Sequence, residues 1–181
     1  VSTSLARSAG HGALALASVP VALETRALDL EASDLVLPTG PFDLVLVGLV
    51  LNELFGARSP SEALAASAAL VRGLFARRSP LGALVIVEPA LLETARRLQT
   101  LRDALVAGGD DLHVVAPCVD RAPCPLLRRE RDWCHEDLPL ALPPPLAALA
   151  KRAGLRWEGA SYAYLALSRT ESFQRVMNFT S

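Results

Sequence analysis

The sequence predicts an α/β protein with a doubly wound, mostly parallel sheet. Two segments, Phe42–Leu51 and Leu81–Glu88, are continuously apolar and rich in Val and Leu, which is typical of strands buried on both faces of a parallel sheet. Each is followed by a segment with helical character, and successive strand–helix units form right-handed parallel crossovers. The chain has 181 residues, 51% of them hydrophobic and 20% charged, which is enough for one folded domain and excludes extended disorder.

Two helices are expected after these strands. The first begins at Ser59, whose side chain can cap the helix, with Glu62 placed to complete a capping box. It is expected to run to about Arg77. The second covers residues 90–107 and is stopped by a pair of glycines.

Shorter elements are expected in the rest of the chain. They are a helix within Leu5–Ser18, a strand over Ala22–Leu30, a helix over Leu146–Ala153, strands over Leu155–Trp157 and Ser161–Ser168, and a polar tail over residues 170–181. Residues 110–145 hold seven prolines and all three cysteines, so an irregular insertion is expected there. We treat 1–181 as a single partial domain that contains this insertion.

The first apolar strand indicates that part of the sheet is missing. A strand as apolar as Leu44–Leu51 needs a neighbour on each edge and cover on both faces, and few strands precede it. There is no initiator Met, so we expect the chain to be part of a longer polypeptide that supplies the first strands. An interior position for this strand predicts that Leu46→Asp abolishes folding, because the charge would be buried.

Charge and hydropathy exclude two classes of protein. The net charge is −1, which excludes a simple basic nucleic-acid-binding chain but not a local basic face. The longest unbroken apolar run, Leu44–Leu51, has eight residues and is too short to span a bilayer. No membrane partner is therefore expected.

Polar residues follow the predicted strands directly. In open α/β sheets, ligands bind outside the carboxyl ends of the strands, and Asp29, Asn52, Glu53 and Glu88 would lie at that edge. Alternatively, Asp29 and Glu88 only terminate strands and Asn52 only caps a turn.

The segments FDLV from residue 42, LNEL from residue 51 and VIVEP from residue 85 resemble the fourth and fifth strands of class I S-adenosylmethionine-dependent methyltransferases. The resemblance implies S-adenosylmethionine as cofactor, with Asp29 near the adenine and Asn52 beside the pocket. The glycine-rich loop that holds the cofactor in that family is absent. Backbone donors in such a loop approach a ligand closely, so we expect this chain to bind S-adenosylmethionine weakly or not at all.

The three cysteines, Cys118, Cys124 and Cys134, lie within one stretch of sequence. An odd, clustered set is not a disulfide framework, whereas thiolates bind zinc and iron–sulfur clusters. Three thiolates are one short of a full set, and His113 or His135 could complete a Cys3His zinc site. Three ordinary free cysteines remain the alternative.

The cysteine segment carries a sharper resemblance. A Cys-x5-Cys-Pro pattern followed by Asp-Trp-Cys-His, together with SYAYLAL from residue 161, resembles the mitochondrial small-ribosomal-subunit methyltransferase-like assembly proteins and their bacterial relatives, over residues 22–170. The resemblance implies a four-cysteine [4Fe–4S] cluster for which Cys118, Cys124 and Cys134 supply three ligands. Zinc remains open as the bound metal.

The function that this resemblance implies is association with the small ribosomal subunit, with action on or binding to rRNA during assembly. Arginines beside the cysteines could contact phosphate; they are Arg121, Arg128, Arg129 and Arg131. Alternatively, this is a solvated loop, because Asp120, Glu130 and Asp132 nearly cancel the positive charge. Two alternatives stay open: a methyltransferase of another substrate with a structural metal, and a non-enzymatic metal-binding scaffold. The implied location is the cytoplasm of a bacterium or the mitochondrial matrix of a eukaryote.

Overall fold

A computed structural model describes residues 22–109, 111–157 and 159–169. The chain divides into two compact units, Val1–Val36 and Leu37–Ser181. The helix expected within Leu5–Ser18 and the tail over 170–181 lie outside the described residues.

The described part of the first unit, residues 22–36, contains no helix or strand. The prediction of a strand over Ala22–Leu30 is therefore wrong. These residues are mostly exposed, and their polar groups are satisfied locally: Arg26 donates to Glu24, and Asp29 accepts from the backbone of Glu31 at 2.9 Å. Short-range bonds of this kind favour irregular structure over a strand ladder.

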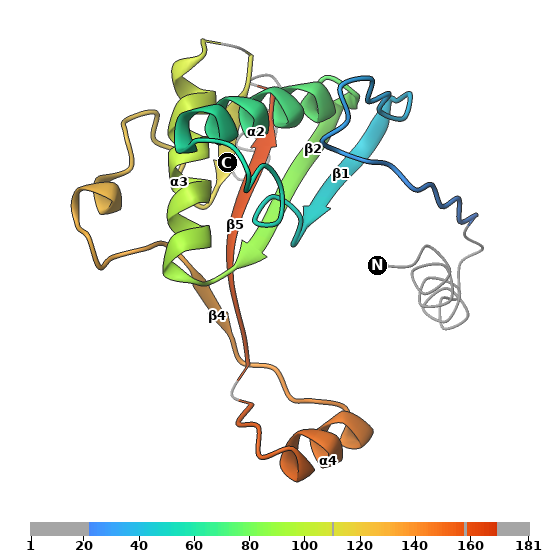
Figure 1. Cartoon of the computed structure of the whole chain (residues 1–181), viewed down its shortest axis with the longest axis vertical. Helices are drawn as coiled ribbons and strands as arrows, with labels where there is room; N and C mark the ends of the chain where they lie inside the picture. The colour runs from blue at the N-terminus through green and yellow to red at the C-terminus, as the bar shows by residue number, and fades with distance from the viewer. Residues whose placement is uncertain (1–21, 110, 158, 170–181) are drawn as a thin grey trace, which may run out of the picture. The chain divides into compact units, whose positions relative to one another are not determined.

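The second unit is built on an open, mixed sheet, seen in Figure 1. Its strands are β1 (Phe42–Gly48), β2 (Arg78–Pro89), β3 (His113–Ala116), β4 (Glu136–Leu138) and β5 (Ala160–Ser168). The order is β1-β2-β5-β3, with β4 paired to the start of β5. β1 and β2 are parallel, whereas β5 is antiparallel to both of its main neighbours. The α/β class is confirmed, but the sheet is mixed rather than mostly parallel.

Two long helices, α2 (Pro60–Phe75) and α3 (Leu92–Ala107), pack against each other and against β2 on one face of this sheet. The predicted capping box is present, since Ser59 accepts from the backbone of Glu62 and the Glu62 carboxylate accepts from the backbone of Ser59. α3 ends at the predicted glycine pair, where Gly109 adopts φ 72°. α2 and α3 cover the same face, and α4 does not pack on the sheet, so the described residues do not form a doubly wound sheet.

The two faces of the sheet differ in burial. On the helix-covered face, Ile86 and Leu165 pair across β2 and β5 and are fully or almost fully buried. On the other face, Leu44 and Leu46 of β1 are 60% and 65% exposed. β1 is an edge strand among the described residues, so the prediction of an interior strand buried on both faces is wrong for this part of the chain.

Residues 111–157 contain more regular structure than expected. β3 and β4 add to the sheet, and a short 3-10 helix, η1 (Pro125–Arg128), lies between them. The β4–β5 pair leads to α4 (Pro144–Arg152), close to the predicted Leu146–Ala153. The strand expected over Leu155–Trp157 does not form.

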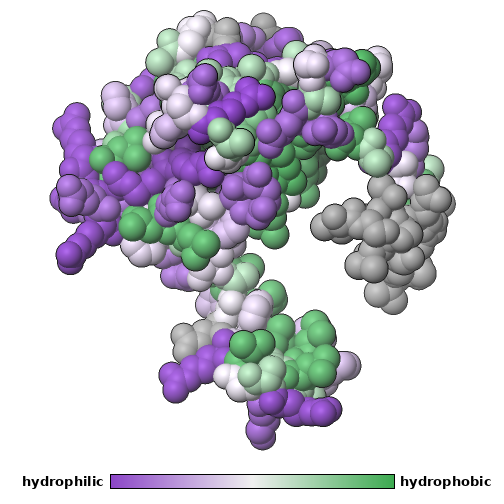
Figure 2. Space-filling model, in the orientation of Figure 1, coloured by the Kyte–Doolittle hydropathy of each residue, from purple (hydrophilic) through white to green (hydrophobic). Residues whose placement is uncertain are grey.

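α4 is not packed into the core. It has no buried residue, and Figure 2 shows hydrophobic side chains on the surface of this segment. In the part of the chain that the structure describes, no helix combines the length and apolar character required to cross a membrane.

Candidate functional site

The loop that follows β1 is held by the buried carboxylate of Glu88, at the end of β2. Glu88 is 2% exposed. Its Oε1 accepts from the backbone N–H groups of Val50 at 3.2 Å and Leu51 at 2.8 Å, and its Oε2 accepts from that of Asn52 at 3.3 Å. Several N–H donors compensate for burying a carboxylate. Glu88 therefore has a structural role in fixing the loop, beyond terminating β2.

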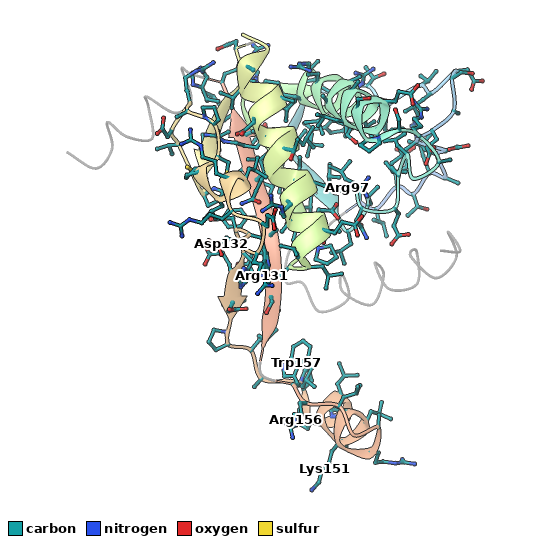
Figure 3. All side chains as sticks on the ribbon, turned by 60° about the vertical axis from the view of Figure 1, so that its left-hand side comes forward. Arg97, Arg131, Asp132, Lys151, Arg156 and Trp157 are labelled. Atoms are coloured by element: carbon teal, nitrogen blue, oxygen red, sulfur yellow. The ribbon has the colours of Figure 1, made fainter. Side chains whose placement is uncertain are left out.

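The same loop adopts unusual backbone conformations. Leu49 and Phe55 have φ values of 55° and 61°, which are uncommon for residues other than glycine. Arg97 of α3, labelled in Figure 3, donates to the carbonyl oxygens of Asn52 and Leu54, both at 3.4 Å. Such backbone conformations persist only where the surrounding structure fixes them, and they are common at binding sites.

The side chain of Asn52 leaves one polar atom without a partner. Its Nδ2 donates to Glu53 at 3.1 Å, but its Oδ1 is buried and accepts no hydrogen bond from the described residues. A buried acceptor of this kind costs free energy unless a ligand or water donates to it.

A cleft of about 820 Å³ opens beside this loop, between α2 and α3. Asn52 and Glu88 line it, together with apolar residues and the cations Arg58, Arg96 and Arg97. The cleft combines an apolar lining with a few placed polar groups, as small-molecule sites do. Asp29 lies in the other compact unit, so its predicted proximity to a cofactor stays a prediction.

The three cysteines line a second, smaller cavity of about 50 Å³. Cys118 is exposed as a residue, whereas Cys124 and Cys134 are half-buried. The cavity is closed by residues from α3 on one side and from β5 on the other. Residues separated by up to sixteen positions in the sequence are thus brought to one place.

α3 anchors the loop that carries the cysteines. The guanidinium of Arg96 donates to four loop carbonyls, among them those of Arg129 at 2.6 Å and Asp132 at 2.9 Å. The Asp103 carboxylate accepts from the backbone N–H of Cys124 at 2.9 Å. These bonds replace the regular backbone pairing that prolines prevent in this loop.

Two polar side chains of α3 enter the thiol cavity. Gln99, 7% exposed, donates from Nε2 to Cys124 Sγ at 3.5 Å. Arg102, 6% exposed, donates from Nη1 to Asp103 at 2.8 Å and to the Ala122 carbonyl at 2.5 Å. Its Nε and Nη2 are buried without a partner in hydrogen-bond geometry, as is Gln99 Oε1.

Electrostatics in this cavity couple the guanidinium to the sulfurs. Burial lowers the pKa of Arg102, but the hydrogen bond and negative charge of Asp103, together with the negative charge of Cys118 and a hydrogen bond to it, outweigh burial and raise the pKa overall. Burial raises the pKa of Cys134, and the neighbouring Cys124, Glu136 and Cys118 raise it further. The cavity therefore holds a fixed cation beside thiols that repel one another once ionised.

Neither His113 nor His135, the two histidines expected as possible zinc ligands, lines the thiol cavity. His135 stacks on Trp133, with ring centroids 5.3 Å apart, and lies 3.7 Å from Asp137. His113 Nδ1 lies 3.5 Å from Arg121. Across residues 22–109, 111–157 and 159–169, no group of three or more His, Cys, Asp and Glu side chains is arranged to hold a metal ion.

Gln99, Arg102 and the anchoring Arg96 were not singled out from the sequence. A signal was available: Ala95, Leu98, Gln99, Arg102 and Leu105 follow the spacing of one helix face, and all five are buried. A buried stripe normally holds apolar residues at this spacing. Two polar residues within it mark a place where the helix faces something other than a hydrocarbon core.

The comparison with known families gives a match over almost the whole chain. The model of the family described as mitochondrial small ribosomal subunit Rsm22 matches residues 2–180. No curated protein matches the chain. The family suspected from the cysteine segment is thus confirmed, and the chain belongs to the mitochondrial small ribosomal subunit Rsm22 family.

Proposed function

We propose that this chain binds the small ribosomal subunit during its assembly, using a thiolate-held iron–sulfur cluster to fix its cysteine loop. The observation that carries the association is the family match over residues 2–180, whose description names the mitochondrial small ribosomal subunit. The family description supports the mitochondrial matrix as the location in a eukaryote, and we propose the cytoplasm for a bacterial protein.

The thiol cavity supports a cluster as the bound group. Three cysteines line one cavity, yet the described residues offer no set of ligands around a single ion. A structural zinc site needs four ligands, and cysteine thiolates are the ligands that hold iron–sulfur clusters. When bound, the cluster would be held by Cys118, Cys124 and Cys134 and would cross-link the loop.

The surface around this loop suits an RNA partner. Arg121, Arg128, Arg129 and Arg131 are exposed, and Figure 3 shows Arg131 beside Asp132 on the loop ahead of β4. Arg129 pairs with Asp132 at 3.2 Å on the surface, a contact weak enough to be exchanged for phosphate. Binding of rRNA is therefore the proposed role of this loop.

Co-sedimentation tests the association. The chain is mixed with purified small or large ribosomal subunits and centrifuged through a sucrose gradient; we expect it to migrate with small subunits. Arg128→Glu with Arg131→Glu should weaken binding at least tenfold and reduce its salt dependence. Arg26→Glu, an exposed arginine of the other unit, is the matched control. A chain that stays at the top of the gradient contradicts the proposal.

A second candidate function, methyl transfer with S-adenosylmethionine, is favoured by the buried, partnerless Asn52 Oδ1 and by the cleft that Asn52 lines. Asp29 and Asn52 are the residues proposed to contact the cofactor. Calorimetry on this chain should give weak binding or none, and a longer polypeptide with a glycine-rich loop should bind. Tight binding by this chain refutes the first expectation, and no binding by the longer one favours a non-enzymatic scaffold.

A further inference from the structure

The buried face of α3 holds two polar side chains that packing alone does not require. Gln99 and Arg102 are three residues apart and both line the thiol cavity. Burying an amide and a guanidinium costs free energy that apolar residues at these positions would avoid. Their presence indicates a partner in the cavity that needs hydrogen-bond donors and positive charge.

Arg102 is held so that part of its guanidinium remains available. Nη1 is occupied by Asp103 and by the Ala122 carbonyl, which fixes the plane of the group. Nε and Nη2 are buried and lack a partner in hydrogen-bond geometry. The planar fork of an arginine can be tethered on one side and donate from the other, which a lysine cannot do.

The cysteine sulfurs can accept hydrogen bonds from these side chains, because all three cysteines line the same cavity. Gln99 Nε2 already donates to Cys124 Sγ at 3.5 Å, and Arg102 shares the cavity with Cys118. Sulfur ligands of an iron–sulfur cluster carry negative charge, and hydrogen bonds to them tune its reduction potential.

We propose that Arg102, assisted by Gln99, is a positioning residue that donates to the cysteine sulfurs and neutralises the charge of a thiolate-bound cluster. The inference rests on the proposed cluster. An arginine with a purely structural role would not change the reduction potential of the cluster, whereas Arg102 in this position should. Because a nearby cation stabilises the reduced, more negative cluster, removing Arg102 lowers the reduction potential.

The test uses the full chain purified without oxygen. Iron, acid-labile sulfide and the midpoint potential are measured for the wild type, Arg102→Met, Arg102→Gln and Arg102→Lys. Arg152→Gln is the control, because Arg152 is an exposed arginine on α4 and does not line the thiol cavity. The melting temperature of each metal-free chain reports whether it folds, and either charge-removing variant that folds is sufficient.

We expect Arg102→Met and Arg102→Gln to shift the potential to more negative values and to lose iron several-fold faster to a chelator. Arg102→Lys should recover part of the potential, and Arg152→Gln should match the wild type. A wild-type potential in a folded, cluster-bearing Arg102→Met or Arg102→Gln chain overturns the inference alone. A wild-type chain without iron and sulfide overturns both the cluster and the inference, while co-sedimentation still decides the ribosomal association.

Discussion

The loop after β1 and the cysteine loop are both held by α3, yet they differ in how their buried polar groups are satisfied. In the first, Glu88 accepts three backbone hydrogen bonds and Arg97 donates to two carbonyls, and among the described residues the buried side-chain atom of this loop without a partner is Asn52 Oδ1. In the second, Arg102 and Gln99 line a cavity with three thiols, and Arg102 Nε and Nη2 and Gln99 Oε1 have no partner in hydrogen-bond geometry among the described residues. The first loop is held mainly by hydrogen bonds within the chain, whereas the second has the buried donors that the proposed cluster would use.

Of the substitutions in the two loops, the one with the largest expected effect on stability is in the first loop. Glu88→Ala leaves three backbone N–H groups without their acceptor and should lower the free energy of unfolding by about 3 kcal/mol. Glu88→Gln keeps the shape and some of the bonds, and should cost about half as much. Urea denaturation measures both. Glu53→Gln, exposed on the same loop, is the control, and an equal loss there would contradict the assigned role of Glu88.

The second-largest loss of stability is expected when Arg96, which anchors the cysteine loop, is replaced. Arg96→Met removes four bonds to loop carbonyls and should cost about 2 kcal/mol. Trypsin should then cleave the loop at its exposed arginines several-fold faster than in the wild type. Arg152→Met, on α4, should change neither quantity. Unchanged proteolysis of the Arg96→Met chain would show that the loop is held by other contacts.

The thiols of the metal-free, reduced chain should differ in reactivity. Burial raises the pKa of Cys134, so less of it is thiolate at neutral pH and iodoacetamide should modify it several-fold more slowly than the exposed Cys118. The difference in modification rate between Cys134 and Cys118 should become smaller as the pH rises. The folded state favours the protonated form of the Cys134 thiol. Its contribution to the free energy of unfolding is therefore fully present below the ordinary thiol pKa and is lost as the pH rises through the raised pKa of the folded state. Mass spectrometry at pH 7 and pH 9 checks the order, and faster modification of Cys134 at pH 7 contradicts it.

The smallest effect is expected outside both loops. Leu46 is 65% exposed, so Leu46→Asp should fold and lose no more than about 1 kcal/mol, mainly from strand propensity. Ile86→Asp, on the covered face, should not fold, because it buries an isolated charge. Circular dichroism melting distinguishes the two. Failure of Leu46→Asp to fold would restore the interior position that the sequence alone predicts for this strand.

Local signals in the sequence were sufficient for much of the fold. The capping box at Ser59 located α2, and the continuous apolar segment ending at Glu88 located β2, because both depend on neighbouring residues. The alternation around Tyr162 and Tyr164 located β5. β3 and β4 were missed, since strands of four and three residues are defined by pairing with β5 rather than by their own composition.

The candidate site was predicted less completely than the fold. The cysteines could be singled out from their spacing, but their placement against α3 depends on contacts made by Arg96, Gln99 and Arg102 across more than fifteen residues of sequence. The exposure of Leu46 was also missed, because a continuously apolar segment predicts a strand without showing whether one or both faces of its sheet are covered. Tertiary contacts decide both features.

The most direct test of the central claim, that the three cysteines hold one cluster, is the metal content of the chain purified without oxygen. Iron, sulfide and zinc are measured for the wild type and for a chain with Cys118→Ser, Cys124→Ser and Cys134→Ser. The account predicts about four irons and four sulfides per wild-type chain, and neither in a variant that still folds. Equal iron in the two chains, or stoichiometric zinc without sulfide in the wild type, would contradict it.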